Sequence, residues 1–464
     1  MRKIWIGAAL LVAATGCTAY APEGGFGPVA EEARARLGRE AVWIKTDAQA
    51  AAARARVREL LARPLDADAA VQIALYNNRG LQAAYAELGI AEAGLVQAGR
   101  FANPKFGFDR LRRGDDLDIE RGLSFNLLGA LVMPIAIAIE ERRLAHAQLS
   151  TAGEVVRLAA DVRRAWLMAV AARQTAAALE RGLEAAGARA ELAKRMAEIG
   201  NVSRLVHARE HAFYAETAAL SARARVQAEA DRERLVRLLG LWGEDRDFAL
   251  PDRLPDLPAA AQASDDLEAR AMAQRLDIRM ARAEIEGLAK SMGLNRATRF
   301  VNVLEVSYFH NSETRRTHQT GYGIEISVPL FDWGDARIAR AEALYMQAVE
   351  RVAEAAVNAR SQVRESYLGY RAALDLARHY RDEIVPLRAR IGDELLQRYN
   401  GMLIGVFELL ADSRDQIQAV IAAVESQRDF FLAEIDLSAA MTVGGAGGGR
   451  RALLALGAAP AAGH

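Results

Sequence analysis

The chain is poor in the residues on which disulfide-stabilised, large-cored or nucleic-acid-binding proteins depend. Its 464 residues include one cysteine, Cys17, which excludes an internal disulfide and a cysteine-based zinc site. Aromatic residues make up only 6% of the chain, although large cores rely on them. Basic and acidic residues balance at 60 each, so no excess positive charge attracts nucleic acid. These absences argue against a large globule and against nucleic-acid binding.

Proline is absent from a long stretch of the chain, between Pro134 and Pro251. The stretch is rich in Ala, Leu, Arg and Glu, which favour helix, and no proline interrupts its backbone hydrogen bonds. Gly200 and Asn201, followed by Ser203, form a loop signal between two helical patterns. The sequence therefore predicts a long helical hairpin whose tip lies near residue 200.

The second half of the chain repeats this plan. A helical pattern runs from about Asp335 to Tyr399, breaks at Asn400 and Gly401, and resumes to about Ala440. At ~1.5 Å per residue the first of these helices is about 100 Å long, so it needs lateral partners along its length. Its seam residues recur at alternating steps of three and four, which favours coiled-coil or helical-barrel packing, although a simple amphipathic helix shows the same pattern. The seam consists of Ile338, Ala341, Tyr345, Ala348, Val352, Ala355 and Ala359.

Two strand-like hairpins, at residues 101–128 and 300–330, precede the long helices. Apolar and polar residues alternate in both, which predicts one apolar and one polar face. The strands have about the ten residues that a tilted membrane strand needs. Hairpins packed on a helical core would alternate in the same way, but the helices offer no compact core to cover. The apolar positions are Phe106, Phe108, Leu117, Ile119, Leu123, Phe125 and Leu127, then Tyr322, Ile324, Ile326, Val328 and Leu330.

Matching positions indicate that one unit is repeated along the chain. Gly122 and Gly323 are 201 positions apart, and so are Gly200 and Gly401. The predicted organisation, after residues 1–17, is an N-terminal extension at 18–66, a first repeat at 67–250, a proline-rich linker at 251–263, a second repeat at 264–440, and a tail at 441–464. The tail is rich in Gly and Ala without periodicity, and we expect it to be disordered.

Residues 1–17 are typical of an export signal, with a basic start and an apolar run at 4–14 that is too short to span a bilayer. The segment Ala14-Thr15-Gly16-Cys17 resembles a bacterial lipobox, in which the cysteine is acylated. A plain signal peptide with an incidental cysteine is the alternative. Thr18, rather than aspartate, follows Cys17, and by resemblance to lipoprotein sorting rules this indicates the outer membrane.

Several motifs resemble the TolC-type outer-membrane efflux family. Residues 323–334, GIEISVPLFDWG, resemble the strand-to-helix signature of that family. Residues 77–84, NNRGLQAA, resemble its first helix, and residues 399–410 are similar to its helical tip. The resemblance covers roughly residues 67–440. In the first repeat, residues 127–134, LLGALVMP, stand in place of the signature. The resemblance therefore does not define where strand passes into helix in that repeat.

The resemblance implies a mainly α-helical homotrimer with membrane β-structure. Each chain would give four strands to one shared transmembrane β-barrel and its long helical hairpins to a periplasmic α-barrel tunnel. Four strands alone cannot close a barrel, and membrane sheets tolerate no open edge, so oligomerisation is expected. The family performs no chemistry: it forms a passive exit duct for small molecules or metal ions, driven by an inner-membrane pump through a periplasmic adaptor.

The resemblance also implies where the partners bind. The adaptor would contact the two helical tips, formed by Gly200, Asn201, Val202, Ser203, Gly401, Met402 and Leu403. In TolC itself, aspartates past the tip glycine narrow the entrance, whereas Phe407 and Leu410 occupy those places here. Glu408 and Asp412 lie nearby as candidates for a pore constriction, and a solvated helix face is the alternative.

Candidate groups for catalysis or metal binding are few. His207 and His211 are four residues apart, a spacing that suits a metal, but the sequence shows no third ligand, so we predict no metal site. Glycine-rich phosphate loops and nucleophile motifs are absent, so we expect neither an enzyme nor a cofactor. Two other classes stay open: a periplasmic adaptor, which usually has one helical hairpin and long β-rich segments, and a structural coiled-coil lipoprotein, which would lack the alternating strands.

Overall fold

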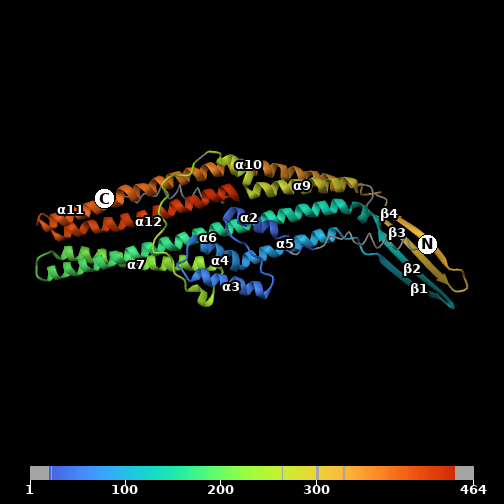
Figure 1. Ribbon diagram of the computed structural model, residues 1–464, viewed down its shortest axis with the longest axis horizontal. Helices are drawn as coiled ribbons and strands as arrows, with labels where there is room; N and C mark the ends of the chain where they lie inside the picture. Colours follow the sequence, from blue (N-terminus) through green and yellow to red (C-terminus); the bar gives the residue numbers. More distant parts are fainter. Residues whose placement is uncertain (1–19, 22, 264, 299–302, 328–329, 445–464) are drawn as a thin grey trace. The chain divides into compact units, whose positions relative to one another are not determined.

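The computed structural model describes residues 20–21, 23–263, 265–298, 303–327 and 330–444 (Figure 1). The predicted export signal with Cys17 and the tail from residue 445 onward lie outside the described residues. The chain divides into two compact units, and each draws on both predicted repeats. The first unit comprises Met1–Val29, Ala83–Ala152 and Asp277–Ala356, and the second comprises Ala30–Gln82, Gly153–Leu276 and Val357–His464.

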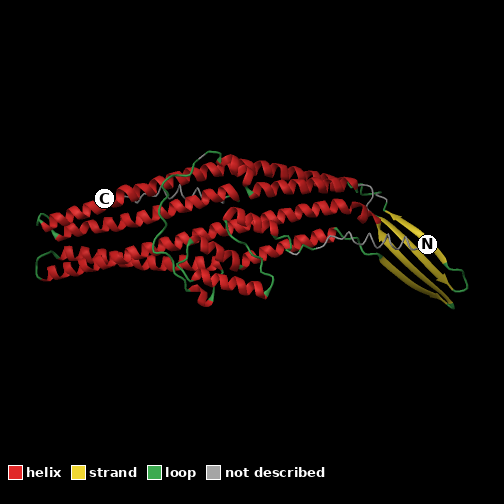
Figure 2. Ribbon diagram, viewed as in Figure 1, coloured by secondary structure: helices red, strands yellow, loops and turns green. Residues whose placement is uncertain are grey.

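Helices make up most of the described chain, as the sequence predicts (Figure 2). The N-terminal extension contains two of them, α2 (Gly27–Leu37) and α3 (Asp47–Leu61), for which no prediction was made. The remaining helices are α4 (Ala67–Asn77), α5 (Arg79–Ala98), α6 (Leu127–Glu198), α7 (Arg204–Leu239), α8 (Leu267–Gln274), α9 (Leu276–Ala297), α10 (Asp335–His379), α11 (Val385–Asn400) and α12 (Val406–Thr442). None of the described helices is both long and apolar enough to cross a bilayer.

The four strands of the first unit form one antiparallel sheet in the order β1-β2-β3-β4 (Figure 1). Strands β2 and β3 come from different repeats, so their pairing joins the two hairpins into a single sheet. The strands are β1 (Lys105–Arg113), β2 (Asp116–Asn126), β3 (Leu304–Glu313) and β4 (Gln319–Ile326).

A side-chain hydrogen bond to the backbone shapes the crossing from strand to helix in both repeats. Asn126, the last residue of β2, accepts a hydrogen bond from the Gly129 N–H at 2.8 Å, and α6 begins at Leu127. Asp332 accepts one from the Gly334 N–H at 2.8 Å, in the turn that precedes α10. Of the two bonds, that of Asn126 is a helix cap, because it satisfies an otherwise orphaned N–H in the first turn of α6. The first repeat therefore starts its long helix without the signature found in the second, and α6 contains Pro134.

The predicted helix from Asp335 to Tyr399 is interrupted in the structure. Helix α10 ends at His379, a π-helical turn follows at Tyr380–Ile384, and α11 continues from Val385. The reason is Pro386, which lacks an N–H and whose ring would clash with the carbonyl group four residues earlier. The predicted extent of the helix is confirmed, and the prediction missed only the change in helical hydrogen bonding near this proline.

An apolar core of the second unit lies between α8, α10 and α12. Tyr370 and Phe430 are both fully buried, with ring centroids 5.5 Å apart, and Leu374 is buried beside them. The proline-rich linker is fixed to this unit by side-chain donors. Arg378 donates to the Pro258 carbonyl at 3.0 Å, and Arg173 binds Asp252 at 2.6 Å. The linker is therefore part of the packed unit.

Candidate membrane sheet and helical tips

The register of the sheet assigns each strand residue to one of two faces. Residues directly opposite each other on antiparallel strands share a face, and faces alternate along each strand. Phe106 pairs with Leu123, Leu123 with Tyr308, and Tyr308 with Tyr322, so one row crosses all four strands. We name the face that contains this row the apolar face. It carries Phe106, Phe108, Arg110 and Arg112 of β1, Leu117, Ile119, Arg121, Leu123 and Phe125 of β2, Leu304, Val306, Tyr308, His310 and Ser312 of β3, and Thr320, Tyr322, Ile324 and Ile326 of β4.

The predicted apolar positions that lie within the strands all fall on this face, which confirms the alternation. Their side chains are largely uncovered: Phe106 is 69% exposed, Tyr322 83% and Ile324 71%. An apolar surface of this extent marks a membrane or protein interaction site. Leu127 and Leu330 follow their strands, and Val328 lies outside the described residues.

The opposite face, which we name the polar face, is strongly acidic. It carries seven carboxylates against two cations, with Leu111 and Phe309 as its large apolar residues. Lys105 forms an ion pair with Glu305 at 2.7 Å across the sheet. The carboxylates are those of Asp109, Asp116, Asp118, Glu120, Glu305, Glu313 and Glu325, and the cations are Lys105 and Arg113.

The first helical tip lies in the second unit, between α6 and α7. Gly200 adopts a left-handed conformation with φ of 80°, and the Asn201 N–H donates to the Met196 carbonyl at 2.8 Å. Ser203 then caps α7 by accepting a hydrogen bond from the Val206 N–H. This is the Schellman ending of a helix, in which a glycine takes the left-handed position.

The second tip has the same backbone hydrogen bonds, shifted by one residue from the positions that the 201-residue repeat predicts. The Leu403 N–H donates to the Arg398 carbonyl at 2.9 Å, and Met402, with φ of 58°, is the left-handed residue. Gly401 has φ of −77° and occupies no strained position. Gly200 therefore corresponds in structure to Met402, 202 positions later, and the sequence match of Gly200 with Gly401 is off by one at the tip.

Both tips expose apolar side chains. Ile199 is 71% exposed and Leu205 59% in the first tip, while Met402 is 93% exposed and Leu403 77% in the second. Ile199 and Leu205 were not among the predicted tip residues, although they flank Gly200 and Ser203 in the sequence. Gly200, Asn201, Ser203 and Gly401 are exposed as well, and Val202 is half-buried.

Each helical hairpin has an ion pair between its two arms. Arg189 of α6 binds Glu210 of α7 at 2.9 Å, with both side chains nearly buried. Arg388 of α11 lies 3.5 Å from Asp412 of α12. The Asp412 side chain is 9% exposed and also accepts from Gln416, so it faces the other arm of its hairpin. Glu408 is exposed.

The histidines show no metal cluster. His207 and His211 have ring centroids 6.3 Å apart, and no group of three metal-binding side chains occurs among the described residues. His310 and His318 stack at 5.4 Å. His310 lies within β3, and His318 directly precedes β4.

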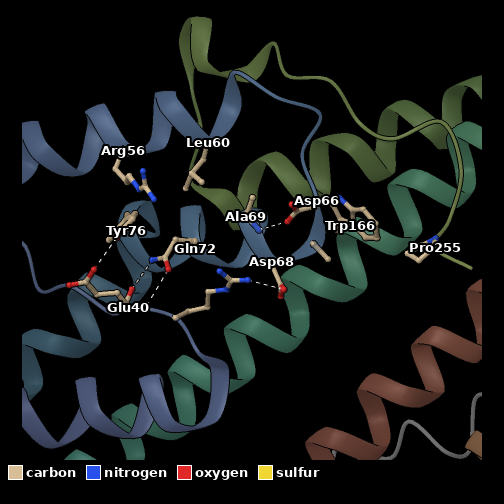
Figure 3. Close-up of a pocket in the computed structure, with 12 residues that line it drawn as sticks. Glu40, Arg56, Leu60, Asp66, Asp68, Ala69, Gln72, Tyr76, Trp166 and Pro255 are labelled. Carbon is tan, nitrogen blue, oxygen red and sulfur yellow. Dashed lines mark hydrogen bonds and ion pairs between the residues drawn. The ribbon is translucent and has the colours of Figure 1, made fainter. Parts of the chain in front are cut away.

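A cleft of about 570 Å³ opens in the second unit beside α3, α4 and α6 (Figure 3). The charged side chains at the cleft pair with one another or with near neighbours. Asp68 lies 2.8 Å from Arg39 and 3.1 Å from Arg163, and Arg56 pairs with Glu59. Burial alone would raise the pKa of Asp68, but hydrogen bonds from Arg163 and Arg39 outweigh it and hold that pKa below its usual value. The two ion pairs of Asp68 join α4 to α6 and to the loop that precedes α3, whereas the pair of Arg56 with Glu59 lies within α3.

Comparison with known proteins agrees with the sequence motifs. A family model described as "Outer membrane efflux protein" matches residues 267–401. No curated protein matches the chain by sequence.

Solved structures resemble a larger part of the chain. A membrane protein from Pseudomonas aeruginosa superposes with a TM-score of 0.69 and 17% identity, covering 83% of this chain and 92% of that one. The VceC outer membrane protein of Vibrio cholerae gives 0.67 and 17%, covering 81% and 95%. The CmeC outer membrane channel of Campylobacter jejuni gives 0.64 and 16%, covering 81% and 85%. At these identities the solved structures show the fold alone, and the similarity in sequence to the outer membrane efflux protein family covers residues 267–401.

Proposed function

We propose that the protein is the outer-membrane channel of a tripartite efflux system, a passive exit duct that performs no chemistry. The observation that carries this proposal is the single apolar face, which continues in register over all four strands and is backed by an acidic polar face. A sheet of this kind suits a barrel wall, with the apolar face toward lipid and the polar face toward a water-filled lumen.

The two edges of the sheet support a trimer. Strands β1 and β4 each pair on one side only within the described chain. Unpaired backbone groups are too costly in a bilayer, so these edges need partners, and the edges of neighbouring copies supply them. Three copies of the four-stranded sheet give a closed barrel of twelve strands, within the range of such barrels.

The helical tips are the proposed contact with a periplasmic adaptor, through which an inner-membrane pump drives export. Exposed apolar side chains surrounded by polar ones are suited to docking another protein. Ile199 and Leu205 supply these side chains in the first tip, and Met402 and Leu403 in the second.

Acylation of Cys17 would add a lipid anchor. The chain is fixed soon after this residue, because the Ala21 N–H donates to Glu92 of α5 at 2.6 Å, within the unit that contains the sheet. A lipid on Cys17 would therefore be tethered only four residues from this attachment.

The test is conductance of the purified full chain in planar bilayers, together with chemical cross-linking of the same preparation. We expect discrete conductance steps from a cross-linked trimer. A closed tip would also silence the channel, so a second variant, Arg414→Ala, is measured in parallel. It removes the 3.8 Å ion pair of Arg414 with Glu216, which joins α12 to α7. Silence of both proteins, or a monomer in both, would overturn the proposal and favour an adaptor or a structural coiled-coil lipoprotein.

A further inference from the structure

The apolar face changes character toward the hairpin turns. The region of this face between the strand ends that connect to the helices and the row of Leu123 and Tyr308 carries only apolar and aromatic residues. Closer to the turns, the same face carries three arginines, Arg110, Arg112 and Arg121. The period of two was visible in the sequence, where Phe106 and Phe108 are followed at the same parity by Arg110 and Arg112.

The charges of the sheet are sorted by face. Every carboxylate within the four strands lies on the polar face, and none lies on the apolar face. Among the described residues, no carboxylate pairs with any of the three arginines. The Arg112 Nε–H donates to the Gly114 carbonyl at 3.0 Å, and Arg121 Nη1 lies 3.4 Å from the Ser312 hydroxyl and 3.5 Å from His310 Nδ1.

Guanidinium groups that no carboxylate neutralises, beside an apolar surface, favour an anion at the same depth. A guanidinium group is costly in hydrocarbon but binds phosphate oxygens with a fork of donors. We propose that Arg110, Arg112 and Arg121 bind the phosphate groups of anionic lipids in the membrane leaflet nearest the hairpin turns. This inference rests on the proposed function, because it requires the apolar face to contact lipid.

The neighbouring side chains favour a lipid over free phosphate. Phe108 lies on the same face between Phe106 and Arg110 and is 55% exposed. The rings of Tyr308 and Tyr322 lie 5.5 Å apart in the adjacent row. A lipid places its phosphate on the arginines and its acyl chains on these rings, whereas inorganic phosphate gains nothing from them.

The test compares two double variants of β1 in the full-length trimer. Arg110→Gln with Arg112→Gln removes two cations from the apolar face, and Lys105→Gln with Arg113→Gln removes two from the polar face. Binding of phosphatidylglycerol is measured by native mass spectrometry, with phosphatidylcholine of the same acyl chains and inorganic phosphate as separate arms. At about 1 kcal/mol for each basic residue near a charged membrane surface, the first variant should bind phosphatidylglycerol about 30-fold more weakly.

The variant with Lys105→Gln and Arg113→Gln should bind phosphatidylglycerol with an affinity within about threefold of the wild type. Its lost charges lie on the polar face, and the gain of about 1 kcal/mol applies only to basic residues near the lipid. Replacement of Arg110 and Arg112 by lysine should restore part of the affinity, because the charge returns without the fork of donors. Equal losses in both double variants, or equal binding of the two lipids by the wild type, would overturn the inference.

Conductance in phosphatidylcholine bilayers separates the two proposals. If the wild type conducts in discrete steps but shows no preference for phosphatidylglycerol, only the lipid site is rejected. If neither the wild type nor any variant conducts, the channel and the lipid site are both rejected.

Discussion

At the scale of single residues, the two helical tips show how backbone conformation separates glycines that the sequence aligns. Gly200 has φ of 80°, where a Cβ atom would crowd the backbone even though nothing else lies within 4 Å. Gly401 has φ of −77°, a conformation that any residue adopts. Met402 takes the left-handed position in the second tip, where glycine would be the usual residue.

Alanine at these two glycines should therefore have opposite effects. Gly200→Ala should lower the free energy of unfolding by about 1 kcal/mol, because it forces a left-handed alanine. Gly401→Ala should raise it by about 0.5 kcal/mol, because it restricts the unfolded chain without strain. Urea unfolding of the full chain followed by circular dichroism measures both. Met402→Gly is the complementary change and should stabilise the protein. Equal effects of the two alanine substitutions would contradict the assigned tip geometry.

At the scale of elements, the end of α7 is held by the junction between α4 and α5. The Asn78 side-chain amide donates to the Leu238 carbonyl at 2.9 Å, and that of Asn77 donates to the Leu239 carbonyl at 3.3 Å. These bonds satisfy carbonyl groups that a helix C-terminus leaves without partners. The Asn77-Asn78 motif thus joins three helices that are far apart in sequence.

The close approach at this junction makes Gly240 sensitive to any side chain. A Cβ atom on Gly240 would lie 2.7 Å from the Asn77 carbonyl oxygen, and its φ is 67°. We expect Gly240→Ala to cost about 3 kcal/mol, the sum of backbone strain and overpacking. Gly243 is the matched control, with φ of 64° and nothing within 4 Å of a Cβ atom. Gly243→Ala should cost only about 1 kcal/mol. Melting temperatures of the two variants measure the difference, and equal values would exclude the contact with Asn77.

At the scale of the whole molecule, the acidic polar face should make the proposed channel select cations. Seven carboxylates against two cations in each chain leave a net charge of −5 on the face that would line a barrel. The reversal potential under a tenfold KCl gradient should therefore have the sign expected for preferred potassium permeation. Asp118→Asn with Glu120→Gln should reduce that potential, whereas Arg110→Gln, on the opposite face, should leave it nearly unchanged. An anion-selective wild type would contradict this assignment of faces.

The sequence by itself determined the features that depend on local periodicity. Long helices follow from the missing prolines and the richness in Ala, Leu, Arg and Glu, and the two-sided strands follow from strict alternation. The tip near Gly200 was predictable because glycine and a capping serine act on the adjacent backbone. The arginines of the apolar face obey the same alternation, so their face was also determined locally.

The tertiary structure decided what depends on residues far apart in the chain. The β2–β3 pairing brings Leu123 opposite Tyr308 and turns two separate hairpins into one sheet, which alternation within either hairpin does not specify. The close approach of Gly240 to Asn77 and the nearly buried pair of Arg189 with Glu210 likewise exist only when helices pack against one another. Local patterns choose secondary structure because it is bonded along the chain, whereas register, close approach and charge pairing are fixed by packing.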